Sequence, residues 1–129
     1  MRGLGLAIGA AMVVLPHAAT ADARFVRSLQ MLAPSERLEQ LCDYTAMVRI
    51  RKEQRQFRPD RAVANATSDL KQNGHTIVAK GGAFRSRGKW YALSFTCKAD
   101  PEHLKVESFH FTIGKEIPEA KWASYGLWQ

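Results

Sequence analysis

The chain has 129 residues, 46% of them hydrophobic, and a formal net charge of +7 at pH 7 with its four histidines neutral. This length fits one domain, and the absence of repeats and low-complexity linkers argues against a second one. Beyond the N-terminal segment, no stretch of the sequence is long and apolar enough to cross a membrane.

The N-terminus has the pattern of a secretory signal. A basic start at Arg2 precedes the apolar run from Leu4 to Leu15, and Ala19-Thr20-Ala21 supplies the small-x-small pattern of a cleavage site. A transmembrane anchor is the alternative, but this run is shorter than the ~20 apolar residues that a membrane span needs. We therefore expect residues 1–21 to be removed, with Ala21-Asp22-Ala23 as the second candidate site. Residues 22–129 would then form an exported domain, in the periplasm or outside the cell.

The two cysteines are expected to form a disulfide. Cys42 and Cys97 are the only cysteines, and an even count in an exported chain indicates a bridge. Closing a loop of this size stabilises a protein by roughly 4 kcal/mol in the chain-entropy model. A catalytic thiol beside a histidine is the alternative, but the second cysteine would pair with it.

The N-terminal half of the domain has helical periodicity. Residues 22–32 predict one or two helical turns. Pro34 suits the first turn of a longer helix, and Glu36 and Glu39 favour its positive end. The predicted apolar face of this helix consists of Leu38, Leu41, Cys42, Thr45 and Val48. The helix must end before Pro59.

Beyond Asp60 the periodicity changes to that of strands. The predicted strands are 62–67, 75–80, 90–97 and 104–113, with Asn73-Gly74 as a turn signal. The strand 90–97 is the clearest, with Tyr91, Leu93, Phe95 and Cys97 on one face and Trp90, Ala92, Ser94 and Thr96 on the other. Gly114 is expected to end the last strand, and Pro118 to begin a short C-terminal helix.

These elements predict an α+β domain. Cys42 and Cys97 both lie on apolar faces, so a bond between them requires the helix to lie across the sheet. We expect one N-terminal helix on an antiparallel meander of about three to five strands, a short C-terminal helix and one disulfide. The terminal aromatic residues Trp122, Tyr125 and Trp128 would cover Trp90 on the second face. Their alternative is an exposed cluster for a partner or a membrane interface.

The glycines at 81, 82 and 88 raise the possibility of a phosphate-binding loop. Such a loop must lead into a helix N-terminus, whereas Gly88 leads into the predicted strand from Trp90, and the GxxxxGK[ST] pattern is absent. A hairpin with Arg87-Gly88 at its tight turn explains the glycines better.

A family resemblance rests on short segments spread over most of the chain. The segments are Arg37-Leu38-Glu39-Gln40, Cys42, Pro59-Asp60-Arg61, the run from Gly82 to Tyr91, Cys97, Val106, Phe109 and Ile117-Pro118. In them the chain resembles the bacterial domain-of-unknown-function family 930 from about Leu32 to Leu127. The resemblance implies an exported single domain with the same paired cysteines, and it carries no known activity.

Residues suited to catalysis or metal binding are scattered. Beyond the predicted signal the histidines are His75, His103 and His110, without HxH or HExxH spacing, and the nucleophile pattern GxSxG is absent. A hydrolase or a zinc or copper site built around His103 and His110 remains an alternative. The main expectation is a non-enzymatic protein without catalytic residues, metal or cofactor.

Clustered positive charge is the strongest functional signal. The candidate ligand contacts are Arg85, Arg87 and Lys89 at the hairpin, and Arg49, Arg51, Lys52 and Arg55 in a second cluster that Arg58 and Arg61 extend. These side chains suit an anionic envelope component or an acidic protein. Nucleic acid is not expected as the partner of an exported protein. A merely solvated basic surface and a structural envelope protein are the remaining alternatives.

Overall fold

The computed structural model describes residues 3, 5, 9–10 and 17–129, so most of the predicted signal core lies outside the described residues. The helices are α1 (His17–Gln30), α2 (Pro34–Glu53), α3 (Glu119–Trp122) and the 3-10 helix η1 (Ala123–Tyr125). The strands are β1 (Pro59–Val63), β2 (Lys71–Asn73), β3 (Thr76–Ser86), β4 (Lys89–Ala99) and β5 (Val106–Glu116). None of the described helices has the length and apolar character of a membrane span.

The strands form one antiparallel sheet in the order β1-β3-β4-β5. Strands β3, β4 and β5 are a meander, and β1 and β2 both pair with the outer side of β3. β2 pairs with residues 76–78 and β1 with residues 83–86, so the two short strands follow each other along one edge. At the opposite edge lies β5.

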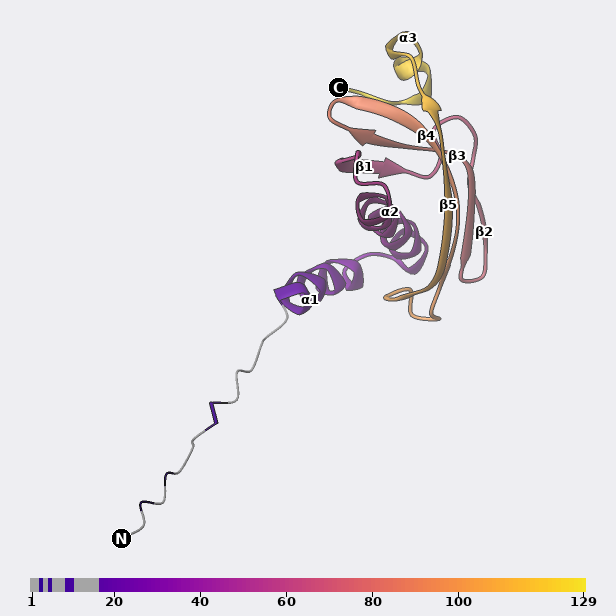
Figure 1. The fold of residues 1–129 in the computed structure, drawn as a ribbon. Helices are drawn as coiled ribbons and strands as arrows, with labels where there is room; N and C mark the ends of the chain where they lie inside the picture. The colour runs from indigo at the N-terminus through magenta and orange to yellow at the C-terminus, as the bar shows by residue number, and fades with distance from the viewer. Residues whose placement is uncertain (1–2, 4, 6–8, 11–16) are drawn as a thin grey trace.

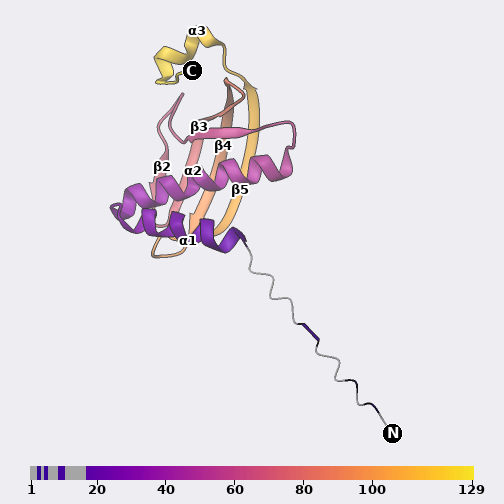
Figure 2. The same cartoon turned by 90° about the vertical axis from the view of Figure 1, so that its left-hand side faces the viewer.

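Helix α2 packs across one face of this sheet (Figures 1 and 2). The main core joins its buried side chains to those of the three long strands. Cys42 and Cys97 lie in this core, fully buried, and form a disulfide between α2 and β4. The predicted mixture of helices with an antiparallel sheet and the predicted disulfide are therefore confirmed.

The helical segments differ from their predictions in two respects. α1 begins at His17 rather than at residue 22 and ends at Gln30, and Phe25 stacks on Tyr44 of α2 with 4.0 Å between ring centroids. The buried face of α2 continues from Cys42 to Ala46 and Ile50, whereas Val48 is 46% exposed. The predicted face was therefore wrong at Val48, and Thr45 is only partly buried, because the contact line advances in steps of four residues from Leu38.

The glycine-rich segment forms the middle and end of β3. Residues 80 and 81 bulge from the ladder with β4, since Ala79 pairs with Phe95 and Gly82 with Leu93. A Cβ on Gly81 would overlap Ser68, because the loop after β1 crosses the strand there. Arg87 and Gly88, with φ values of 52° and 77°, form the two-residue turn between β3 and β4. The predicted hairpin is confirmed.

Three strand predictions require correction. The segment 62–67 is a strand only to Val63, because the N–H groups of Ala66 and Thr67 donate to the Gly81 carbonyl instead of a ladder. The segment 75–80 continues through the glycines to Ser86. The last strand begins at Val106 rather than 104 and passes through Gly114 to Glu116. A bulge opposite residues 91–93 accommodates this glycine.

A second, smaller core covers the other face of the sheet. Trp90 is fully buried there among Ala83, Ile117, Trp122 and Leu127, with Tyr125 packed against them. The indole N–H of Trp90 donates to the Trp128 carbonyl over 2.6 Å. The predicted covering of Trp90 by the C-terminal aromatic residues is confirmed, although the Trp128 side chain is itself half exposed.

Candidate functional site

The two clusters of basic residues meet at one end of the sheet. The backbone N–H of Arg58 donates to the Ser86 hydroxyl over 2.8 Å, and Pro59 pairs with Ser86 in the ladder. Since Arg87 follows Ser86 in the turn, the connection from α2 to β1 lies beside the β3–β4 hairpin (Figure 1). The same connection is fixed by Phe57, whose ring contacts those of Phe84 and Tyr91 edge-on.

Three of the predicted contact residues are neutralised by carboxylates. Arg49 binds Glu53 one turn further along α2, with 2.6 Å between nitrogen and oxygen. Lys89 lies 3.7 Å from Glu116 across the β4–β5 pair. Arg85 binds both carboxylate oxygens of Asp60, each over 2.9 Å.

The Arg85–Asp60 pair resolves a repulsion within the sheet. Arg61 and Arg85 are direct partners in the β1–β3 ladder, where like charges destabilise a pair. The hydrogen bonds from Arg85 lower the pKa of Asp60, which keeps this carboxylate charged next to the two arginines. The Arg85 side chain is only 13% exposed and its guanidinium lies 5.9 Å from the ring centroid of Trp90. Arg85 is therefore held in the structure rather than presented to solvent.

Six of the nine clustered basic residues have no ion-pair partner among the described residues, and we call them the basic end. They are Arg51, Lys52, Arg55, Arg58, Arg61 and Arg87, all exposed. Residues 22–129 carry a net charge of +6, the +7 of the whole chain less Arg2. The nine clustered cations less their three partner carboxylates also give +6, so the rest of this segment is neutral.

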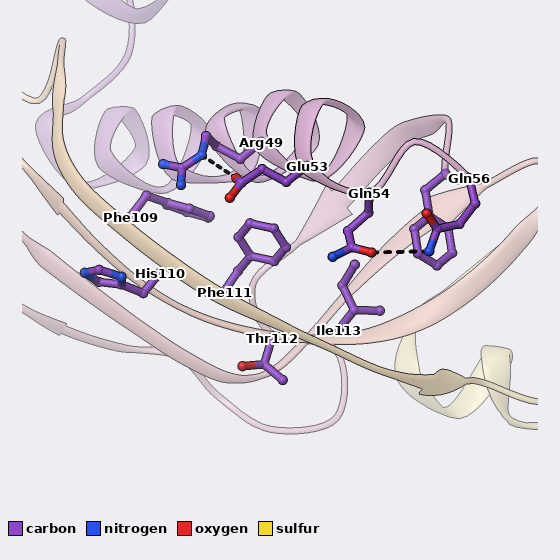
Figure 3. A pocket seen from close by; sticks show the side chains of 10 residues that line it. Arg49, Glu53, Gln54, Gln56, Phe109, His110, Phe111, Thr112 and Ile113 are labelled. Atoms are coloured by element: carbon purple, nitrogen blue, oxygen red, sulfur yellow. Dashed lines mark hydrogen bonds and ion pairs between the residues drawn. The ribbon is translucent and has the colours of Figure 1, made fainter.

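A groove of about 620 Å³ lies between the last turn of α2 and β5 (Figure 3). Its lining comprises Arg49, Glu53, Gln54, Gln56 and Phe57 on one side and Phe109, His110, Phe111, Thr112 and Ile113 on the other. The floor is aromatic and aliphatic, whereas the α2 wall is polar. Sequence reasoning missed this groove. The alternation of Phe109, Phe111 and Ile113 was the only signal in the sequence, since the position of the end of α2 relative to β5 requires the fold.

The histidines do not gather into a three-ligand site. Nδ1 of His103 lies 2.8 Å from the Pro34 carbonyl, which only accepts, so this nitrogen donates. Nε2 of His103 lies 2.8 Å from Nδ1 of His75, and His103 is only 6% exposed. His110 lines the groove instead, on β5. No group of three or more possible metal ligands occurs in the described part of the chain.

One buried acid lacks a partner. Asp43 on α2 is 8% exposed, and its Oδ1 makes no hydrogen bond to the described residues. Desolvation, with the nearby charge of Glu39, raises the pKa of Asp43 to about 8. The carboxyl is therefore mainly protonated at neutral pH, as expected for an acid buried without a cation.

Comparison with known proteins identifies the family of the chain. The model of the family described as Domain of Unknown Function (DUF930) matches residues 29–127, and the chain therefore belongs to this family. Comparisons with curated proteins and with solved structures gave no match. The predicted resemblance is confirmed, and function must be argued from the site itself.

Proposed function

We propose that this DUF930 member is an exported, non-enzymatic protein that binds an anionic partner in the cell envelope through its basic end. The observation that carries the proposal is the concentration of net charge. All +6 of residues 22–129 lies in one group of side chains, while the remaining charges balance. A surface of this kind attracts anions over distances of about a Debye length and holds them by charged hydrogen bonds.

The predicted contact residues differ in whether a carboxylate of the protein already binds them. Arg55, Arg58 and Arg87 are exposed and unpaired among the described residues, so their guanidinium donors can bind phosphate or carboxylate oxygens without losing an existing partner. Arg85 and Lys89 must release a carboxylate first, and Arg49 shares its charge with Glu53 through Nε. We therefore assign primary binding to the basic end, and assign to the three paired cations a supporting role.

Export is supported by two observations. A disulfide buried between α2 and β4 is typical of proteins that fold in an oxidising compartment. The N-terminal sequence has the charge, apolar run and small residues of a cleaved signal. Both fit a periplasmic or extracellular protein.

The test compares two triple variants of the oxidised protein over residues 22–129. In one, Arg55, Arg58 and Arg87 are changed to Gln; in the matched control, the exposed Lys71, Lys105 and Lys121 are changed to Gln. The probes are inorganic polyphosphate and vesicles containing phosphatidylglycerol, measured by calorimetry and by sedimentation. The first variant should bind roughly tenfold more weakly than the wild type, a difference of about 1.4 kcal/mol, and the control should differ little.

Two results would contradict the proposal. Equal losses in both triple variants would mean that only the total charge matters. Binding that does not weaken when salt is raised would exclude a mainly electrostatic contact, since salt screens exposed charges. Binding to polyphosphate and vesicles alike would indicate recognition of the phosphate group, whereas binding to vesicles alone would indicate recognition of a lipid surface.

A further inference from the structure

We propose that the groove between α2 and β5 binds an extended, acidic segment of a partner protein, which pairs with β5 as an added strand. This inference goes beyond the proposed function, because it depends on features separate from the basic end. They are the unpaired edge of β5, the shape of the groove and the position of Arg49.

The first feature is the unpaired edge. β5 is the last strand in the order β1-β3-β4-β5, and no described strand pairs with its outer side. In an antiparallel strand with one partner, alternate residues direct their N–H and C=O groups away from that partner. β5 has 11 residues, and its pairing with β4 is regular from Phe109 to Ile113. These residues offer a continuous backbone template.

The second feature is the path of the groove. Residues 109, 110, 111, 112 and 113 all line it, although successive side chains of a strand point to opposite faces. Contact with five consecutive residues means that the groove follows the line of the strand, and this fits a path at its unpaired edge. Five strand residues extend over roughly 16 Å, which suits a short extended peptide. Figure 3 shows α2 above this path, with Arg49, Glu53 and Gln54 directed toward β5.

The third feature is the order in which apolar and charged side chains lie along the groove. Phe111 and Ile113 are half buried and present apolar surface on the face of β5 that packs toward α2. Next to them, the guanidinium of Arg49 lies 6.0 Å from the ring centroid of Phe109. The Nε of Arg49 binds Glu53, and its two terminal nitrogens make no hydrogen bond to the described residues. They can each donate to an incoming carboxylate.

These positions specify a pattern in the partner. A residue lying beside Phe109 reaches Arg49 and should be acidic. Residues lying beside Phe111 and Ile113, each two positions further along, should be apolar. The expected segment therefore has an acidic residue and two apolar residues at alternate positions. The polar amides of Gln54 and Gln56 line the α2 side, which fits a peptide better than a lipid chain. A second copy of this protein would bring another strongly positive surface, so charge favours an acidic partner.

The experiment uses labelled peptides and the oxidised protein over residues 22–129. The probe has one glutamate followed by two valines at alternate positions, with threonines between them and flexible ends. A second probe has the reversed order, since an added strand can be parallel or antiparallel. Controls carry glutamine for glutamate, or a proline that removes a central N–H. We expect one of the two probes to bind saturably, and amide exchange at residues 108–113 to become slower when that peptide is bound.

The decisive measurement is the coupling between Arg49 and the peptide glutamate. Arg49→Gln should lower the affinity for the glutamate peptide roughly tenfold, about 1.4 kcal/mol, but leave the affinity for the glutamine peptide unchanged. Lys121→Gln, at an exposed position outside both the groove and the basic end, should have little effect on either peptide. The proline peptide should not bind, because the added strand loses a backbone hydrogen bond.

The outcomes separate this inference from the proposed function. If no peptide binds at up to about 1 mM, a binding energy of about 4 kcal/mol, while polyphosphate still requires the basic end, the groove proposal is wrong and the proposed function stands. If a peptide binds but polyphosphate does not, the groove proposal stands and the proposed function is wrong. Equal effects of Arg49→Gln on the glutamate and glutamine peptides would also overturn the groove proposal. A concentration-dependent dimer that protects residues 108–113 would show that a second copy occupies the edge.

Discussion

The two ends of the molecule use their polar side chains in opposite ways. At the end that holds the β4–β5 connection, which we call the closed end, Arg37 donates to the carbonyls of Leu29 and Glu102, over 3.0 Å and 2.9 Å. His103 links His75 to the Pro34 carbonyl. Asp100 accepts from the N–H groups of Leu104 and Lys105. Although desolvation acts to raise the pKa of Asp100, these donors lower it.

The basic end contrasts with this arrangement. Its six cations have no ion-pair partner among the described residues, although carboxylates bind the neighbouring Arg49, Arg85 and Lys89. Donors already bound to backbone acceptors stabilise the fold, whereas donors directed to water remain available to a ligand. The contrast implies that changes at the closed end and its core should lower stability, and that changes at the basic end should mainly lower binding.

Removal of the disulfide should have the largest effect on the stability of the closed end and its core. Changing both Cys42 and Cys97 to Ala should lower the free energy of unfolding by roughly 4 kcal/mol, because the bridge joins residues 55 apart in sequence. Urea denaturation of the oxidised wild type and the variant measures the difference. The Arg55, Arg58 and Arg87 triple variant is the control and should stay within about 0.5 kcal/mol of the wild type. A comparable loss in that control would remove the contrast between the two ends.

Asp43 differs from the polar residues of the closed end, because it is buried and its Oδ1 has no hydrogen-bond partner among the described residues. Its pKa is about 8 in the folded protein and 3.8 when unperturbed, so the folded state binds the proton more tightly. The free energy of unfolding should therefore decrease as pH rises from about 4 to about 8, by several kcal/mol in all. Asp43→Asn should remove this dependence. Near pH 8 it should raise stability by the same several kcal/mol that the wild type has lost there, and it should change stability little at pH 4.

Denaturation at a series of pH values tests the Asp43 prediction. Glu39→Gln is a suitable companion, because the charge of Glu39 contributes to the raised pKa and its removal should reduce the pH dependence partially. A wild-type stability that is constant between pH 4 and pH 8 would show that Asp43 has a bonding partner in solution. A pH dependence that persists in Asp43→Asn would assign it to other groups.

Local patterns in the sequence predicted the features that depend on neighbouring residues. The alternation from Trp90 to Cys97 identified both faces of β4, and Arg87-Gly88 identified the hairpin turn, because period and turn chemistry are local. The disulfide followed from the number of cysteines and the predicted compartment. In each case the physical cause lies within a few residues or in a pair that has no alternative.

The features that sequence reasoning missed depend on distant segments. β3 continues through Gly81 because the loop containing Ser68 crosses it, and nothing near Gly81 records that contact. Arg85 was predicted as a ligand contact, yet Asp60 and Trp90 hold it, since β1 pairs with β3 in that register. The groove depends on where α2 ends relative to β5. Charge clusters can be read from sequence, but the pairing of each charge requires the fold.

His103 provides the finest test of the closed end. It has a positive φ of 58°, a conformation that Asn tolerates, so His103→Asn should keep the backbone and lose both ring contacts. The expected loss is about 2 kcal/mol, because two hydrogen bonds of a buried side chain disappear. His75→Ala removes only the contact between the histidines, at an exposed residue, and should cost less than about 1 kcal/mol. Equal losses would mean that the bond to the Pro34 carbonyl adds nothing, and that the histidine pair alone fastens the β4–β5 connection to the turn before β3.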